Sequence, residues 1–253
     1  MKAARVLREK IADGRIVTGV LTTDLLWPAL VEYLQKAEFD YLIIDLEHGA
    51  HSEQQVAEVC ALGRMIDFPV LIRPIDCDYA TIRRTIDFGP CGCLLPGVES
   101  AIALDGVRDG IYLPPRGRRR PGGPGNYWVK DFLYESWKRE VEDFYIVLPQ
   151  IETRQGLANA DAIAAHEITT AIAIGPYDLS ADLGVCEIMD APQMRDAIEV
   201  IRRAGERCGK TMWRIGDGPT LAAAGFTFLC IAEPMAALKE TLGQKNRATR
   251  EKG

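Results

Sequence analysis

Residues 144–151 read FYIVLPQI, and residues 41–45 read YLIID. Both runs are almost continuously apolar and rich in β-branched side chains. They lack the apolar–polar alternation of a strand that has one face in water. Short runs of this kind, bounded by turn residues, are typical of strands buried on both faces. They indicate a parallel sheet that is covered on both sides.

Similar runs recur along the whole chain, separated by stretches of helix length. The predicted strands are Val17–Thr23, Tyr41–Glu47, Val70–Ile75, Gly92–Val98, Tyr145–Glu152, Ala171–Pro176, Thr211–Ile215 and Phe226–Glu233. Helices are predicted at Ser52–Ile66, which begins with a capping-box pattern, and at Thr153–Ala165 and Asp190–Cys208. Eight repeats of strand and helix predict an α/β fold, a (β/α)8 TIM barrel. We expect one domain over residues 1–253, with an N-terminal helix and a C-terminal helical extension.

The overall composition excludes several classes of protein. The chain has 253 residues, the usual size of one α/β barrel, and a net charge of −6 gives no reason to expect nucleic-acid binding. No apolar run reaches the ~18 residues of a membrane span. The N-terminus lacks the apolar core of a signal peptide, and the seven cysteines form no CxxC pair. These features predict a cytoplasmic enzyme with reduced thiols.

Two segments interrupt the repeat of strands and helices. Leu113–Tyr127 (LPPRGRRRPGGPGNY) is rich in Pro, Gly and Arg and is expected to form a long loop. It is either a solvated connector or a loop that supplies arginine to a substrate or a neighbouring subunit. The charged tail Gln244–Gly253 is expected to fray or to dock on a partner subunit.

Polar residues gather where the predicted strands end, the end at which TIM-barrel enzymes carry their active sites. Together they place carboxylates, a base and a cation on one face of the barrel. They are Asp45, Glu47 and His48 after the second strand, Arg73 after the third, Gln150 and Glu152 after the fifth, and Tyr177 and Asp178 after the sixth.

Glu152 and Asp178 are the best candidates for metal ligands. Both supply carboxylate oxygens at the ends of neighbouring strands. Two such ligands, completed by water and substrate oxygens, suit Mg²⁺, Mn²⁺ or a similar ion such as Co²⁺. The alternative is a structural ion pair between these carboxylates and Arg73.

His48 is the leading candidate for a general base, because imidazole exchanges a proton near neutral pH. Arg73 is suited to hold a substrate carboxylate or keto oxygen through two parallel hydrogen bonds. Asp45 and Glu47 are expected to hold these neighbours in place. The alternatives are a structural histidine and a salt bridge at the rim of the barrel.

No lysine follows a predicted strand, and Lys210 precedes the seventh strand at the opposite end of the barrel. A Schiff-base aldolase requires an amine in the barrel mouth, so the sequence favours a metal as the electron sink. There is also no Walker A loop and no GxGxxG after the first strand.

These motifs resemble the HpcH/HpaI aldolases, which are metal-dependent 2-oxo-3-deoxy acid aldolases. The resemblance extends from about Val17 to the last strand. It rests on the motif from Asp45 to His48, on Arg73, and on a specific block from Gln150 to Gly184 that contains Glu152 and the sequence GPYD at 175–178.

The resemblance implies a role for each of these residues. Glu152 and Asp178 would bind the metal, and Gln150 with the backbone of Tyr177 and Asp178 would position pyruvate. His48 would be the base and Arg73 would stabilise developing negative charge. Asp87 would raise the basicity of the histidine. The family is usually hexameric, with a helix exchanged between subunits.

The implied reaction is reversible retro-aldol cleavage of a 4-hydroxy-2-oxo acid to pyruvate and an aldehyde, through a metal-stabilised enolate. One alternative is oxaloacetate decarboxylation or a condensation like that of macrophomate synthase, which uses the same enolate. Another is a catalytically silent, metal-binding barrel. The sequence departs from the family at Met212-Trp213-Arg214 and at Ala232-Glu233-Pro234, positions expected to surround the aldehyde.

Overall fold

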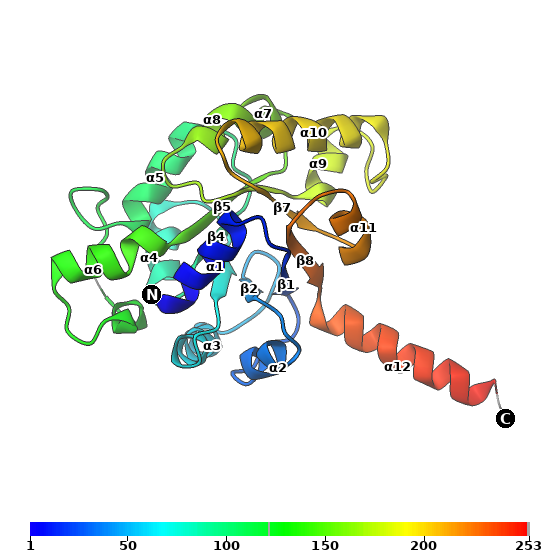
Figure 1. The fold of residues 1–253 in the computed structure, drawn as a ribbon, viewed down its shortest axis with the longest axis horizontal. Coiled ribbons are helices and arrows are strands. Elements are labelled where there is room, and N and C mark those ends of the chain that lie inside the picture. Colours follow the sequence, from blue (N-terminus) through cyan, green and yellow to red (C-terminus); the bar gives the residue numbers. More distant parts are fainter. Residues whose placement is uncertain (121, 252–253) are drawn as a thin grey trace.

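In the computed structural model, which describes residues 1–120 and 122–251, eight parallel strands close into a barrel in chain order (Figure 1). Strand β8 pairs with β1 to complete the ring. The strands are β1 (Val17–Thr22), β2 (Tyr41–Asp45), β3 (Val70–Arg73), β4 (Gly92–Leu95), β5 (Ile146–Ile151), β6 (Ile172–Ile174), β7 (Met212–Ile215) and β8 (Phe228–Ala232). All the predicted strands are present, so the predicted TIM barrel is confirmed.

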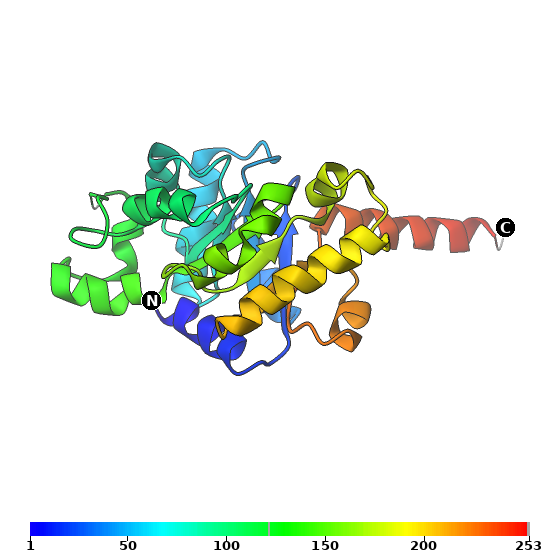
Figure 2. The same ribbon diagram turned by 90° about the horizontal axis from the view of Figure 1, so that it is seen from above.

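Helices surround the strands, as Figure 2 shows from above. They are α1 (Lys2–Ala12), α2 (Leu30–Lys36), α3 (Glu53–Met65), α4 (Tyr79–Asp87), α5 (Ala101–Ile111), α6 (Tyr134–Glu140), α7 (Arg154–Ala158), α8 (Ala160–Ala165), α9 (Pro176–Asp182), α10 (Pro192–Arg207), α11 (Gly218–Ala223) and α12 (Pro234–Arg250), with 3₁₀ turns η1 (Pro124–Trp128) and η2 (Glu142–Phe144). The predicted capping box is confirmed at the start of α3, where Ser52 and Gln55 exchange hydrogen bonds.

One predicted helix is divided in two, and one predicted strand ends earlier than the sequence pattern suggests. The helix predicted over Thr153–Ala165 is divided at Asn159, whose side-chain amide donates to the carbonyl of Glu99 at 2.8 Å. Strand β2 ends at Asp45 because its carboxylate accepts the backbone N–H of Glu47 at 3.1 Å and turns the chain away. The bond at Asp45 is local, and local bonds of this kind compete with regular structure, whereas the bond of Asn159 reaches a distant loop.

The segment Leu113–Tyr127 is a loop for most of its length, and residue 121 within it lies outside the described residues. Two of its arginines form close ion pairs within the same chain. Arg119 is fully buried and donates to Asp87 at 2.8 Å, and Arg118 pairs with Asp109 at 2.7 Å. The segment is therefore packed into the fold at Arg119, whereas Arg118 and Tyr127 are exposed to solvent.

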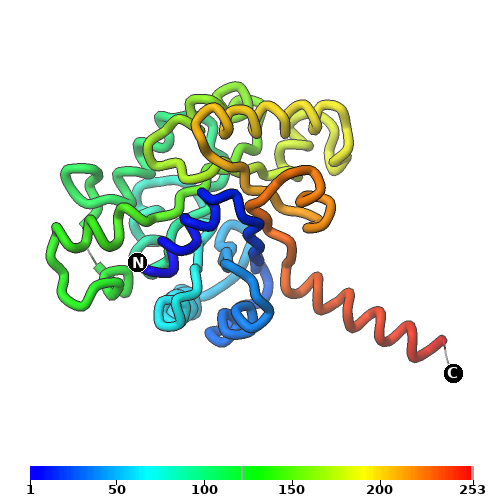
Figure 3. Tube along the Cα trace, in the orientation of Figure 1, coloured from blue at the N-terminus to red at the C-terminus, as the bar shows by residue number. Residues whose placement is uncertain are grey.

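The two ends of the chain differ in their packing. Helix α1 buries Ala3, Ala4, Leu7 and Ile11 against the barrel, whereas α12 buries none of its described residues. The views in Figures 1 and 2 and the trace in Figure 3 all show α12 leading away from the other helices. The tail predicted at Gln244–Gly253 is helical to Arg250, and residues 252 and 253 lie outside the described part.

No helix among the described residues is long and apolar enough to cross a membrane.

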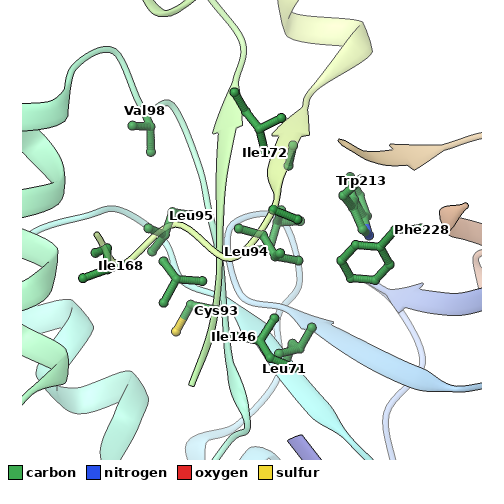
Figure 4. Packing of buried hydrophobic residues seen from close by; sticks show 14 of the residues in the cluster. Leu71, Cys93, Leu94, Leu95, Val98, Ile146, Ile168, Ile172, Trp213 and Phe228 are labelled. Atoms are coloured by element: carbon green, nitrogen blue, oxygen red, sulfur yellow. The ribbon is translucent and has the colours of Figure 1, made fainter. Parts of the chain in front are cut away.

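Bulky side chains fill the barrel interior, including Trp213 and Phe228 (Figure 4). The hydroxyl of Tyr41 donates to the carbonyl of Leu229 at 2.8 Å and accepts the indole N–H of Trp213 at 2.8 Å. Trp213 is only 1% exposed. The expectation that Trp213 borders the aldehyde is therefore wrong: it belongs to the packed core, where its one polar atom is satisfied by Tyr41.

Replacing Tyr41 with Phe is expected to lower the free energy of unfolding by about 1–3 kcal/mol, because the buried N–H of Trp213 then lacks an acceptor. Urea denaturation measures this loss. Tyr33→Phe is the matched control, since Tyr33 is 63% exposed and should change little. If both variants lose the same free energy of unfolding, the buried hydrogen bonds of Tyr41 do not stabilise the fold.

Candidate metal and substrate site

The carboxyl end of β2 is joined to that of β3 by a buried ion pair. Arg73 donates from Nε to Asp45 Oδ1 at 2.8 Å and from Nη2 to Asp45 Oδ2 at 2.7 Å. Burial alone would raise the pKa of Asp45, but the hydrogen bonds and charge of Arg73 outweigh it, so the pKa is lowered. Asp45 is thus an ionised anchor that fixes the arginine.

Glu47 lies between the arginine and the histidine. Its Oε2 is 3.1 Å from Arg73 Nη1 and 3.7 Å from His48 Nε2. The His48 side chain is 60% exposed, so solvent and small molecules reach it. Burial raises the pKa of Glu47 despite the charge of Arg73. The residues that the sequence grouped after β2 and β3 therefore form one connected cluster.

Glu152 follows β5 and is 7% exposed. Its Oε2 accepts the backbone N–H of Gly97 at 2.7 Å, whereas its buried Oε1 has no hydrogen-bond partner among residues 1–120 and 122–251. The pKa of Glu152 is raised to about 7, mainly by burial and also by the nearby carboxylates of Glu47 and Asp178, against the opposing effects of the Gly97 hydrogen bond and Arg73. The site concentrates negative charge that the described side chains do not neutralise.

Asp178 lies in the first turn of α9, which begins at Pro176 directly after β6. Its carboxylate is exposed and acts electrostatically on both Glu47 and Glu152. Tyr177 beside it is 64% exposed. Gln150 is buried on β5, and its side-chain oxygen lacks a partner within the described residues. The end of β5 thus carries two buried oxygens to which no described residue donates, and an exposed carboxylate follows β6.

In a single copy of the chain, Asp87 lies outside this cluster. Helix α4 runs from the carboxyl end of β3 to the amino end of β4, so its last residue, Asp87, lies at the opposite end of the barrel from His48. Its carboxylate accepts a hydrogen bond from Arg119 at 2.8 Å. A role for Asp87 toward His48 stays a prediction, and this chain alone does not bring the two together.

The oxygen ligands fit a divalent cation. Glu152 Oε1 and Gln150 Oε1 are buried acceptors without donors in the described part of the chain. Arg73 is engaged by Asp45 and Glu47, and among the described residues no ion pair joins it to Glu152 or Asp178. The described residues contain no cluster of three or more metal-binding side chains, so a cation here would have two carboxylates and take other oxygens from water or substrate.

The lysines match the expectation for a site without a Schiff base. Lys210 lies before β7, where its ammonium donates to the carbonyls of Ala164 at 2.6 Å and His166 at 2.9 Å. Among the residues that the structure describes, no lysine belongs to the cluster at the carboxyl ends of the strands.

Three supporting residues were missed by the sequence analysis. Gly97 donates its N–H to Glu152 from a backbone with φ +56°. Thr23 donates its hydroxyl to Asp45 at 2.9 Å. Gly175 leaves room for Glu152, because a Cβ there would lie 2.1 Å from Oε1. A glycine at or just beyond the end of a strand is the signal that points to such positions, as with Gly97 after Pro96 and Gly175 after Ile174.

Comparison with known proteins identifies the family of the chain. Residues 23–215 match the sequence model of the family described as HpcH/HpaI aldolase/citrate lyase. A hydroxypyruvate/pyruvate aldolase of Pseudomonas aeruginosa is 32% identical over 210 residues, which cover 80% of this chain and 76% of that protein. A 2-keto-3-deoxy-L-rhamnonate aldolase of Shigella boydii is 26% identical over 94% of this chain and 90% of its own length.

A solved structure gives the same result for the fold. The crystal structure of an HpcH/HpaI aldolase from Desulfitobacterium hafniense superimposes with a TM-score of 0.89 at 27% identity, covering 97% of this chain and 96% of that one. The family match spans most of the chain and includes every residue of the cluster. This chain belongs to the HpcH/HpaI aldolase/citrate lyase family.

Proposed function

We propose that this protein is a divalent-metal-dependent aldolase, a carbon–carbon lyase. It would cleave a 4-hydroxy-2-oxo acid reversibly to pyruvate and an aldehyde. The observation that carries the proposal is Glu152, a buried carboxylate with one oxygen held by Gly97 and the other without a partner in the described chain. The names of the relatives, which are aldolases of pyruvate, hydroxypyruvate and 2-oxo-3-deoxy acids, support the same reaction class.

Glu152 and Asp178 would hold the cation, which is Mg²⁺, Mn²⁺ or Co²⁺ in this proposal. When bound, a divalent cation withdraws electrons from a 2-oxo group and stabilises negative charge on its oxygen. The carboxylates present suit such a hard cation, because they offer oxygen ligands and leave positions for substrate and water. Gln150 and the backbone at Tyr177 and Asp178 would orient the pyruvate half.

The chain's other residues supply the proton transfers. His48 would accept the proton of the 4-hydroxyl group, directly or through water. The C4–O bond then becomes a carbonyl as the C3–C4 bond breaks, and the electron pair passes into the enolate of pyruvate. Return of the proton to C3 gives the methyl group of pyruvate. Glu47, 3.7 Å from His48 Nε2, would orient the imidazole.

Arg73 would stabilise the developing charge from a fixed position. Its two hydrogen bonds to Asp45 hold the guanidinium plane, and its Nη1 points to Glu47. A charge held in place before the reaction needs no reorganisation as the enolate forms, which is the main source of electrostatic catalysis.

The test is an assay of metal-dependent pyruvate release from 4-hydroxy-2-oxo acids, with oxaloacetate as the competing substrate. The proposal expects release from the hydroxy acids and its loss with chelator. Turnover of oxaloacetate alone would instead indicate a decarboxylase or a related enzyme on the same enolate. Exchange of pyruvate methyl protons into deuterated water tests for a silent barrel, which would show none with Mg²⁺, Mn²⁺ or Co²⁺.

We also propose that the protein is a homo-oligomer, a hexamer by its family resemblance, and that its setting is the cytoplasm. The support for an oligomer is α12, whose Met235, Leu238 and Leu242 form an apolar stripe and are 38%, 45% and 55% exposed. Such a stripe on a helix that buries nothing in its own described chain suits the surface of a second copy. The buried, unpaired thiols of Cys60, Cys91 and others suit a reducing compartment.

Replacing Leu238 with Glu is expected to dissociate the oligomer and so reduce the mass of the particle in solution. The substitution places a charge in the apolar stripe that would contact another copy. Light scattering coupled to size-exclusion chromatography measures the mass. Gln244→Glu, on the polar side of α12, is the matched control and should leave the mass unchanged. A wild-type protein that is already monomeric would refute the oligomer proposal, without bearing on the aldolase chemistry.

A further inference from the structure

The seventh strand places two large side chains on opposite faces of the barrel wall. Trp213 points into the interior, where it binds Tyr41. Successive residues of a strand face opposite sides, so Arg214 points outward, between β7 and the covering helices. Its guanidinium carbon lies 4.7 Å from the centroid of the Phe226 ring. This arginine has no part in the catalytic cluster described above.

Arg214 lacks an acidic partner among the residues that the structure describes. Its Nε is buried without a hydrogen-bond acceptor, and none of the described carboxylates forms an ion pair with it. Burial lowers the pKa of Arg214, and no carboxylate opposes this effect. Asp217 lies nearby but is engaged, since its Oδ2 accepts from the backbone N–H of Thr220 at 3.0 Å and from its hydroxyl at 2.5 Å.

The arginine lines a cavity of about 270 Å³ between α9, α10 and α11. Most of the other walls are apolar and include Met189, Met194, Ile198 and Leu221, while Asp217 and Thr220, which are hydrogen-bonded to each other, also line the cavity. A cavity of this size is slightly below the usual range for ligand sites, so it suits a small molecule. An apolar enclosure with one unpaired cation matches a ligand that has a compact apolar body and one negative charge.

We propose that this cavity is a second ligand site, which binds a small organic carboxylate. The carboxylate would pair with Arg214, and the apolar body would lie against Met194 and Ile198. The cavity adjoins the candidate metal site at Pro176 and Tyr177, which line it, whereas Glu152, Asp178 and Arg73 do not. Its existence does not depend on the proposed aldolase activity.

Benzoate and benzamide are suitable probes, because they share a ring and differ in charge. Saturation-transfer NMR titrations would be run with excess pyruvate and Mg²⁺, and repeated in an E152Q background, so that binding at the catalytic site does not contribute. We expect benzoate to bind at least about tenfold more tightly than benzamide. Arg214→Gln should abolish this preference, and Arg203→Gln, at an exposed position on α10, should retain it.

A second variant keeps the proposal testable if Arg214→Gln does not fold. Ile198→Phe keeps the arginine and fills the cavity, so it should weaken benzoate binding by a similar factor. Equal affinities for benzoate and benzamide in the wild type, or an unchanged preference in folded Arg214→Gln, would overturn the proposal. A change of molecular mass in solution on Arg214→Gln would also overturn it, because the partner of the arginine would then be an acidic group of another copy.

Discussion

Replacing Glu152 with Gln is expected to abolish metal-dependent turnover while making the metal-free protein more stable. The amide has the shape of the carboxylate and can still accept the N–H of Gly97 through its oxygen. It carries no charge and is a poor ligand for a hard cation. A bound cation stabilises the negative charge of the transition state by several kcal/mol. Losing this stabilisation is expected to reduce the turnover rate at least ~1000-fold.

The gain in stability follows from the sign of the pKa shift. Burial raises the pKa of Glu152 from an ordinary value of 4.5 to about 7, so the charged form is disfavoured in the folded protein. The stability of the metal-free wild type therefore falls as the pH rises from about 4.5 through about 7. The difference between the two pKa values corresponds to a loss of at most ~3 kcal/mol in the free energy of unfolding above about pH 7. A neutral glutamine at this position has no such loss.

Urea denaturation in the presence of a chelator, at about pH 5 and about pH 8, separates these effects. The variant should exceed the wild type in stability at the higher pH and approach it at the lower one. Calorimetric titration with Mn²⁺ should show that the variant binds the cation much more weakly. Glu240→Gln, on exposed α12, is the control and should leave stability, binding and turnover unchanged. A fully active E152Q variant would remove the central support for the proposed function.

Replacing Gly175 with Ala is expected to reduce turnover about 100-fold or more, although a single methyl group is added. The backbone at Gly175 has φ −98°, which alanine adopts without strain. The cost arises from packing, because the added Cβ would lie 2.1 Å from Glu152 Oε1 and 2.6 Å from its Cγ. The carboxylate must move away from the position in which Gly97 holds it, and small displacements of catalytic groups can cost about 100-fold.

Gly106→Ala provides the matched control, since it adds the same methyl group in helix α5 with no atom within 4 Å. It should leave turnover unchanged and stabilise the helix by about 0.5–1 kcal/mol. Steady-state kinetics with varied Mn²⁺ should show that Gly175→Ala mainly weakens the dependence on metal. If Gly175→Ala and Gly106→Ala are equally active, Glu152 can shift at no cost and its observed position has no functional meaning.

The sequence predicted which polar residues lie together wherever the carboxyl end of a strand bore a polar group. Asp45, Arg73 and Glu152 follow buried apolar runs, and parallel strands bring such ends to one face. Predictions failed where a contact depends on a partner distant in the sequence. Gly97 and Glu152 are 55 positions apart, and no local pattern indicates that the N–H of the glycine holds the carboxylate. The direction of Trp213 likewise depends on Tyr41, 172 positions away.

The sequence by itself determined the order and closure of the barrel, because buried apolar runs that alternate with amphipathic stretches have few compact arrangements. It also determined which residue types meet at the carboxyl ends of the strands. Only the tertiary structure decided how those charges are shared: Arg73 neutralises Asp45 and contacts Glu47, which leaves Glu152 buried with a raised pKa. The physical reason is that desolvation and Coulomb interactions depend on distances through space, which spacing along the chain does not specify.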